Sequence, residues 1–287
     1  MVKHERVADS VYFFQSEEYA EVNAGVVIGT EMAVVIDTLA YPEETAKIIK
    51  FVEQVHQKPI KYVINTHYHA DHTWGNCFFK DAEFIAHSKC KKNLIKYGMP
   101  ALEGVMKGNA FSNDIQIILP DITFSSGSIS LKLGKKTVTA ITLPGHTDDN
   151  IAVFVEEDKV LFTGDTVMPV PYIVDGDIEV TIESLEKLPE MGIENIVQGH
   201  GEIILRGEVN GMVEKNIEYL RFIESTVRKA NKRKYPLDLI EKVTIEDAKK
   251  DRTIMGGLAE SLHQSNLIAV YEKTFGEKPI GSEEYFV

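Results

Sequence analysis

Three histidines and an aspartate lie close together in this sequence and have the types and spacing of metal ligands. They are His67, His69, Asp71 and His72. Imidazole and carboxylate groups suit zinc, and they also bind iron or manganese. His67 and His69, two residues apart on a strand-to-loop segment, can face one ion, whereas Asp71 and His72 can face a second ion. Alone, this cluster supports only a metal-site hypothesis.

Three more candidate ligands follow downstream, each placed after an apolar run. His146 stands in a turn after one strand candidate, Asp165 follows another, and His200 lies between two glycines after a third. Because ligands at strand ends can arrive at the same edge of a layered fold, we expect these side chains to join the first cluster. A chance arrangement with this order and these glycine neighbours is improbable.

The ordered set resembles the motifs of the metallo-β-lactamase superfamily of hydrolases. The matching motifs run from His67 to His200, and the order of strands and helices extends the resemblance over about residues 11–201. The resemblance implies a four-layer αββα sandwich with the site at one edge. It also implies the ligand sets: His67, His69 and His146 for the first metal, Asp71, His72 and His200 for the second, and Asp165 as a bridge.

The same resemblance implies hydrolysis by water activated between two metal ions, most simply zinc, with hydroxide formed near neutral pH. Asp71 would orient the hydroxide or carry a proton as well as bind metal. Histidine rather than glutamate at position 69 favours hydrolysis over the redox members. Asp165 stands where the clinical β-lactamases have cysteine or serine, which favours the glyoxalase II and lactonase-like branches. Asp37 matches an aspartate that supports the ligands through hydrogen bonds, and a simple turn role is the alternative.

We therefore expect a dinuclear metal-dependent hydrolase of a small ester, thioester, lactone or amide. A phosphodiesterase or β-lactamase-like hydrolase is one alternative, and a non-catalytic metal-dependent sensor or binding protein is another. Tyr172 and Trp74 are candidates for substrate contact, although packing beneath the metal loop is the favoured role of Trp74. The segments 98–120 and 169–178 are expected to shape the pocket. Gly98–Pro120 is either a lid or an irregular packing segment.

Short apolar runs predict the strands that carry these residues. The strand candidates are Val11–Phe14, Ala24–Ile28, Ala33–Ile36, Tyr62–Ile64, Phe84–Ala86, Ile122–Phe124, Ile129–Leu133, Val138–Leu143, Ile151–Val155, Val160–Phe162 and Ile193–Val197. Helices are expected from Pro42, from Ser88 as a cap to about Tyr97, and over Glu179–Met191. This alternation predicts an α/β fold with two sheets and helices outside them, in four layers.

The last part of the chain is predicted to be helical. Apolar spacing indicates a long helix from Glu208 to about Asn231, a helix start at Thr244–Asp247 and a final helix over Leu258–Tyr271. We divide the chain into a catalytic part, residues 1–207, and a helical segment, residues 208–287, that packs on the same domain. An alternative role for these helices is to form a homodimer.

Composition limits the kinds of partner that we expect the protein to bind. The 287 residues carry a formal net charge of −13, which argues against a nucleic-acid partner and leaves a small-molecule substrate. No apolar run approaches the ~20 residues that a membrane span needs, and no signal peptide is recognisable, so a cytoplasmic protein without membrane contact is expected. Cys77 and Cys90 are too few for a disulfide framework and are expected to be structural.

Overall fold

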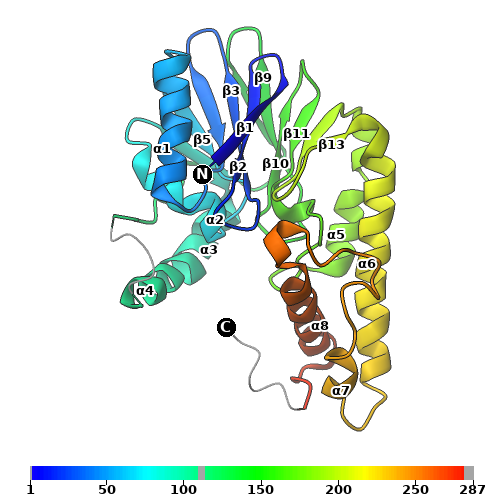
Figure 1. Cartoon of the computed structure of the whole chain (residues 1–287). Helices are drawn as coiled ribbons and strands as arrows, with labels where there is room; N and C mark the ends of the chain where they lie inside the picture. Colours follow the sequence, from blue (N-terminus) through cyan, green and yellow to red (C-terminus); the bar gives the residue numbers. More distant parts are fainter. Residues whose placement is uncertain (1, 109–113, 281–287) are drawn as a thin grey trace.

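A computed structural model describes residues 2–108 and 114–280, which contain two packed β-sheets (Figure 1). The strands of the first sheet follow the chain, in the order β1-β2-β3-β4-β5-β6-β7. Strands β1 to β4 pair antiparallel, and β4 to β7 pair parallel. The bounds are β1 Val2–Ala8, β2 Val11–Ser16, β3 Asn23–Ile28, β4 Ala33–Ile36, β5 Ile60–Ile64, β6 Glu83–His87 and β7 Ile122–Phe124.

The second sheet has the order β13-β12-β11-β10-β9-β8. Its neighbours pair antiparallel except β11 and β12, which are parallel. A parallel pair needs a crossover connection, and the helix α5 (Ile178–Leu185) supplies it. The bounds are β8 Ser128–Lys132, β9 Thr137–Thr142, β10 Ile151–Val155, β11 Val160–Phe162, β12 Asn195–Val197 and β13 Ile204–Leu205.

Alternating side chains of the strands build two cores from one sheet. Along β4, Val34 and Ile36 face the second sheet, where they share a core with Val153. Ala33 and Val35 point to the opposite face and share a second core with Ile48 of α1. Because successive side chains of a strand point to opposite faces, a strand that is apolar on both faces must lie between two layers.

Helices cover the outer faces of both sheets, so the molecule has the four layers that the sequence predicted (Figure 1). Helix α1 (Pro42–Lys50), continued by the turn η1 (Phe51–Val55), lies on the first sheet. Leu161 and Ile196 of the second sheet pack instead against helices that follow in the chain. The remaining helices and helical turns before residue 209 are α2 Ala70–Thr73, η2 Trp74–Phe78, α3 Ser88–Asn93, η3 Leu94–Gly98, α4 Met99–Lys107, η4 Gly164–Thr166, η5 Leu188–Met191 and η6 Arg206–Glu208.

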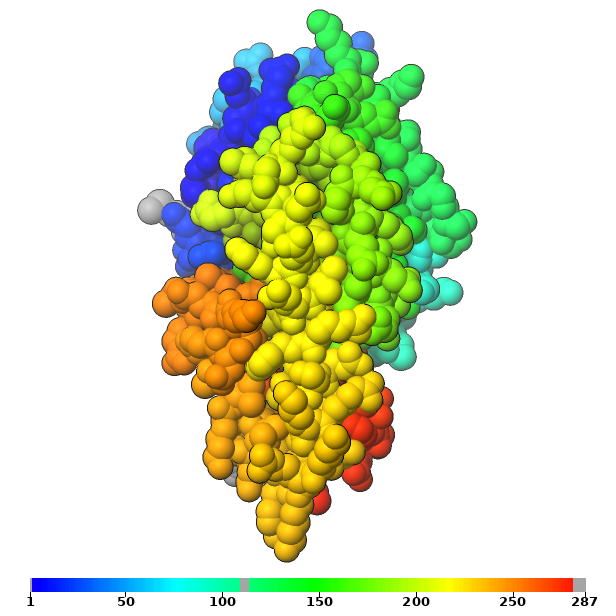
Figure 2. Space-filling view, turned by 90° about the vertical axis from the view of Figure 1, so that its right-hand side faces the viewer, coloured from blue at the N-terminus to red at the C-terminus, as the bar shows by residue number. Residues whose placement is uncertain are grey.

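The carboxyl-terminal segment is helical and packs on the second sheet. It contains α6 (Val209–Ala230), α7 (Leu237–Ile240), η7 (Met255–Gly257) and α8 (Ala259–Phe275). Apolar side chains of α6 and α8 belong to the same core as the outer face of that sheet. Figure 2 shows α6 in yellow along this face, with the orange segment that precedes α8 beside it. In the described ranges, no helix combines the length and the apolar character that a membrane crossing requires.

Three local predictions were wrong. The predicted helix start at Thr244–Asp247 is a turn, because the Asp247 carboxylate accepts from the backbone and hydroxyl of Thr244 and Lys249 then adopts a φ of 60°. Ser88 is not the cap of α3: His87 is, and its Nδ1 accepts from the backbone N–H of Lys89 at 3.3 Å. The segment 98–120 contains the helix α4, which its glycines and prolines concealed; residues 109–113 lie outside the described residues.

Candidate metal centre

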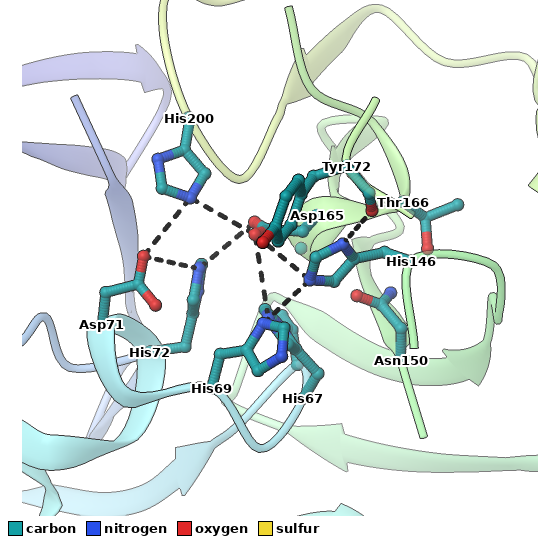
Figure 3. A network of polar contacts seen from close by, with 12 residues as sticks. His67, His69, Asp71, His72, His146, Asn150, Asp165, Thr166, Tyr172 and His200 are labelled. Atoms are coloured by element: carbon teal, nitrogen blue, oxygen red, sulfur yellow. Dashed lines mark hydrogen bonds and ion pairs between the residues drawn. The ribbon is translucent and has the colours of Figure 1, made fainter. Parts of the chain in front are cut away.

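The carboxyl ends of strands from both sheets meet at one edge, and the predicted ligands converge there (Figure 3). His67 and His69 directly follow β5, and the short helix α2 carries Asp71 and His72. The other three ligands follow strands of the second sheet: His146 after β9, Asp165 in η4 after β11, and His200 after β12.

The side chains form two adjacent groups of candidate ligands. One group consists of His67, His69, His146 and Asp165, and the other of Asp71, His72 and His200; in each, the ligand atoms lie within 4.8 Å of one another. The Asp165 carboxylate lies between the groups. Its Oδ2 is 3.5 Å from His146 Nε2 and 3.2 Å from His200 Nε2, and its Oδ1 is 3.2 Å from His72 Nε2.

Each histidine of the cluster has one ring nitrogen held by the surrounding chain. These contacts join His67 Nδ1 to Thr66 Oγ1 (3.0 Å), His69 Nε2 to Asp175 Oδ2 (3.1 Å), His72 Nδ1 to Asp37 Oδ2 (2.9 Å), His146 Nδ1 to the Tyr172 carbonyl (2.6 Å) and His200 Nδ1 to the Ala20 carbonyl (2.9 Å). Carbonyl and carboxylate oxygens only accept, and the Thr66 hydroxyl already donates to Asp37. The histidine nitrogens therefore donate, which in the neutral rings leaves a lone pair facing the cluster.

Several inward-facing atoms have no partner that satisfies them. His67 Nε2, His72 Nε2 and Asp165 Oδ1 are buried and make no hydrogen bond, although the last two lie 3.2 Å apart. His69 Nδ1 and His146 Nε2 face each other at 2.9 Å. Buried polar atoms without partners are costly unless another group satisfies them. Imidazole and carboxylate donors aimed at a common centre suit a divalent metal ion, so the residues fit such an ion.

Burial and charge favour the metal-binding forms of His67, His146 and Asp165. For His72 and His200, by contrast, the Asp165 carboxylate outweighs burial and raises the pKa. Burial lowers the pKa of His67 well below its usual value and that of His146 to about 4, so both rings are neutral at pH 7. For Asp165, burial favours the protonated form, but His200 and His72 outweigh it and hold the pKa well below the usual range. Neutral imidazole and ionised carboxylate are the forms that bind metal.

Asp37 supports both the strand end and a candidate ligand. Its carboxylate accepts from the backbone N–H of Thr66 at 2.8 Å, from the Thr66 hydroxyl at 2.7 Å and from His72 Nδ1 at 2.9 Å. Asp37 itself has a φ of 57°, a left-handed conformation that side-chain-bearing residues rarely adopt. These contacts agree with the supporting role that we predicted for Asp37, beyond a simple turn.

Two glycines allow the ligand loops to approach each other. A Cβ at Gly199 would lie 1.8 Å from Asp165 Oδ1, and a Cβ at Gly164 would lie 2.7 Å from the Thr66 side chain. Gly164 also has a φ of 53°. Any side chain at either position would displace the ligand loops, which explains the glycine beside both Asp165 and His200.

Asp175 is a functional candidate that the sequence analysis did not name, although it lies in the 169–178 loop. Its carboxylate contacts His69 Nε2 at 3.1 Å and accepts from the Tyr68 hydroxyl at 3.2 Å. The hydrogen bond from His69 lowers the pKa of Asp175, which keeps this carboxylate ionised. A carboxylate on the outer nitrogen of a metal-binding histidine fixes the orientation of the ring. Asp175 thus positions His69.

Helix α8 holds the loop that carries Tyr172 and Asp175. Lys273 Nζ donates to the carbonyls of Ile173, Val174 and Gly176 at 3.1, 2.6 and 2.7 Å. The buried Asn266 side chain donates to the Pro171 carbonyl and accepts from the Ile173 N–H, at 2.7 and 2.9 Å. The carboxyl-terminal segment therefore supports two candidate ligands indirectly, since this loop contacts both His146 and His69.

A cavity of about 320 Å³ opens over the ligands. The metal-ligand side contributes His69, Asp71, His146, Asp165 and His200, and Tyr172 and Asp175 of the adjoining loop also line the cavity. Other lining residues were missed from the sequence: Tyr19, Ala20, Ala70, Met168, Met255, Leu258 and Leu262. Single aromatic or aliphatic residues carry no signal of their own, so only the fold identifies them.

Trp74 lies away from this cavity. It is buried in a cluster with Leu102 of α4 and Ile115, and Ala70 and Ile117 pack against that cluster. Its placement matches the packing role rather than a substrate contact. The described part of the 98–120 segment packs in the same way and does not line the cavity.

The histidines His4, His56 and His263 and the two cysteines have ordinary packing contacts outside the ligand cluster. His4 stacks on Phe14, His56 packs on Phe51, and His263 contacts the Tyr219 hydroxyl. Cys90 is buried, and the half-buried Cys77 donates to the Trp74 carbonyl at 3.5 Å. Neither cysteine belongs to the two groups of candidate ligands.

Comparison with known proteins agrees with this geometry. The family model described as the metallo-beta-lactamase superfamily matches residues 20–200, a range that contains all seven candidate ligands. Among curated relatives, thioesterase pkgB of Emericella nidulans is 28% identical over 167 residues, 57% of this chain and 41% of that protein. The chain spans less than half of the length of the first curated relatives that it matches.

Two solved structures share the fold. A metallo-beta-lactamase from Pontibacter korlensis has a TM-score of 0.62 and 18% identity, and the match covers 75% of this chain and 98% of that one. The sec-alkylsulfatase Pisa1 from Pseudomonas sp. has a TM-score of 0.72 and 15% identity, and the match covers 96% of this chain and 50% of that one. The second match is long enough to include much of the carboxyl-terminal helical segment.

Proposed function

Because this chain belongs to the metallo-β-lactamase superfamily, we propose that it is a dinuclear zinc hydrolase of a small, neutral ester, thioester, lactone or amide. The proposal assigns His67, His69 and His146 to one ion and Asp71, His72 and His200 to the other. Asp165 would bridge the two ions.

One observation carries the proposal: the outer ring nitrogen of every clustered histidine is held by the protein, and the inner nitrogen faces a shared centre. A structural cluster would need no such common orientation. The Asp165 carboxylate supports two ions rather than one, because its two oxygens approach histidines of both groups: Oδ2 lies 3.5 Å from His146 Nε2, and Oδ1 lies 3.2 Å from His72 Nε2.

Two divalent ions at this site would lower the pKa of a shared water, so that hydroxide forms near neutral pH. The chain's own residues orient the reaction. Of the two candidate ligands on α2, Asp71 is the one that lines the cavity, and its Oδ2 lies 3.4 Å from His200 Nε2. Its carboxylate can hold the attacking water and accept its proton. The role fits the general-base requirement for a group within hydrogen-bond reach of the nucleophile.

The bridging residue supports an ester-type substrate. Aspartate stands at position 165, where the family resemblance implies cysteine or serine in the clinical β-lactamases. One relative is named thioesterase pkgB, which supports hydrolysis of an ester-type bond. The lining of the cavity adds a second argument, since its described residues include no lysine or arginine that would hold a phosphate. A phosphodiesterase and a β-lactamase-like hydrolase are therefore the less favoured alternatives.

The test combines a metal count with a substrate panel. Purified protein would be analysed for zinc, iron and manganese, then assayed with chromogenic esters, thioesters, lactones, phosphodiesters and nitrocefin, with and without chelator. We expect two metal ions per chain and ester or thioester turnover that the chelator abolishes. Tight metal binding without turnover on any member of the panel would instead favour a metal-dependent sensor.

A further inference from the structure

The cavity over the candidate ligands has two unlike sides. One side consists of histidines and carboxylates, and the other is an apolar wall from the carboxyl-terminal segment. We define the apolar wall by Met255, Leu258 and Leu262, which belong to η7, the start of α8 and α8 itself. Met168 lines the same cavity. The wall lies beyond the residues that the family model matches, 20–200.

The wall exposes apolar surface at the cavity. Leu258 is 38% exposed, and Tyr19, across the same lining, is 45% exposed. Leaving such side chains in water forfeits the free energy that their burial would contribute, about 25 cal/mol per Å². A contiguous apolar surface beside polar groups in a concave site is typical of ligand binding.

The backbone of the wall is held in an uncommon conformation. Met255, Gly256 and Gly257 have φ values of 56°, 66° and 88°, so three successive residues are left-handed. Glycine adopts this region freely, but a methionine there is strained. The Met255 side chain is only 1% exposed and belongs to the core of the second sheet, which holds it in place. Strain that the surrounding packing enforces is common where a segment must present a side chain to a ligand.

The carboxylates of the cavity lining disfavour an anionic substituent on the substrate. Its described lining contains the carboxylates of Asp71, Asp165 and Asp175 and no lysine or arginine. Apart from the candidate metal ligands and the proposed ions, no described residue of the lining carries a positive charge that would neutralise an anionic substituent. An uncharged, apolar substituent meets no such penalty and can contact the wall directly.

Building on the proposed hydrolase, we infer that the apolar wall binds the acyl group of the substrate, and that this group is an uncharged alkyl chain of several carbons. The wall and the candidate ligands line one cavity, so an acyl chain can lie on Leu258 and Leu262 while its carbonyl reaches the metal side. The cavity of about 320 Å³ matches the smaller ligand pockets of proteins. Leu258 is thus a specificity-determining residue.

The test measures kcat/KM for p-nitrophenyl acetate, butyrate, hexanoate and octanoate with the zinc-loaded protein. Each methylene buried on the wall should raise kcat/KM up to about fourfold, until the cavity is full. Leu258→Ser should reduce the preference for hexanoate over acetate at least fivefold. Leu205→Ser is the matched control, because Leu205 is an exposed leucine of β13 outside the cavity; it should keep the wild-type preference.

A binding measurement separates this inference from the proposed function. The binding of N-methyloctanamide and N-methylacetamide would be measured by calorimetric titration. The wild type and Leu205→Ser should bind the longer amide more tightly. In Leu258→Ser, the difference in affinity between the two amides should be smaller. If no ester is hydrolysed but this binding pattern is found, the hydrolase proposal fails and the apolar site stands. Ester turnover that is independent of chain length, or a chain-length preference that Leu258→Ser retains, would overturn the acyl-binding inference alone.

Discussion

The two sides of the cavity differ in where they come from along the chain. The ligand side uses residues between His67 and His200, at the ends of strands that the fold brings to one edge. The apolar wall uses Met255, Leu258 and Leu262, which lie after α6 and outside the range that the family model matches. The part that the family model matches carries the candidate ligands, and the segment beyond it borders the cavity. Reaction type and substrate choice can therefore change independently.

The two sides are nevertheless linked. The loop that holds His146 and His69 through Tyr172 and Asp175 is itself held by Lys273 of α8. The carboxyl-terminal segment thus contributes to the ligand side as well as to the wall. The following variants test whether the ligand side and the apolar wall act independently.

The largest effect is expected on the ligand side. His69→Ala removes a nitrogen that lies 2.9 Å from His146 Nε2, and it should remove the first ion. Turnover should fall more than about 100-fold, because loss of a contact that merely supports a ligand already costs 10–100-fold. Metal analysis and ester turnover provide the readouts. His56→Ala, a histidine packed on Phe51, is the control and should keep both ions; equal metal content in the two variants would contradict the ligand assignment.

Asp175→Asn should have an intermediate effect on metal affinity, and this effect should be confined to the first ion. The amide oxygen still accepts from His69 but lacks the negative charge that strengthens this hydrogen bond, so the affinity of this ion should fall about tenfold while the second ion is retained. Competition with a chromogenic chelator measures both affinities. Asp148→Asn is the control, since Asp148 is an exposed partner of Lys89 at 3.1 Å. Equal loss of both ions would show that the loop positions the whole cluster rather than His69.

Lys273→Met tests the link between the two sides. It removes three hydrogen bonds to carbonyls of residues 173–176, and the free energy of unfolding should fall by about 1 kcal/mol. Thermal unfolding should shift down by roughly 2–4 °C. Lys249→Met, at an exposed lysine that pairs with Glu218, should leave the transition unchanged. An unchanged transition in Lys273→Met as well would mean that α8 does not brace the loop.

The smallest effect is a change of the free energy of unfolding with pH. Lys250 donates to the Pro169 carbonyl and to Asn216 Oδ1, both at 2.7 Å, and burial lowers its pKa to about 8. The unfolded lysine has a pKa near 10.4, so between about pH 8 and 10.4 the unfolded state binds more protons and stability rises with pH. Denaturant unfolding of the wild type should gain on the order of 1 kcal/mol over this window relative to Lys250→Met. A constant difference between the two proteins would contradict the depressed pKa.

The sequence revealed the ligand side because each of its residues obeys a local rule. His146, Asp165 and His200 each follow an apolar strand, and strand ends of both sheets must lie at one edge. The same rules predicted the strands β4, β10 and β11 with their observed bounds. Helix α4 was missed because Pro100 lies in its first turn, where proline is tolerated but weakens the helical pattern.

The wall and Asp175 could not be predicted in this way. Asp175 reaches His69 only because the 169–178 loop is folded against α8, and that contact joins residues about a hundred positions apart. Leu258 and Leu262 have the spacing of any buried helix face, so their pattern indicates packing, not a cavity. Contacts between distant segments depend on tertiary packing, which periodicity does not encode.

The central claim is that this chain uses two ions held by seven side chains to hydrolyse an ester. Its most direct test is to titrate the metal-free protein with zinc while following hydrolysis of p-nitrophenyl butyrate. Turnover should rise with added zinc and reach its plateau at two ions per chain. A plateau at one ion, or turnover that needs no metal, would contradict the account.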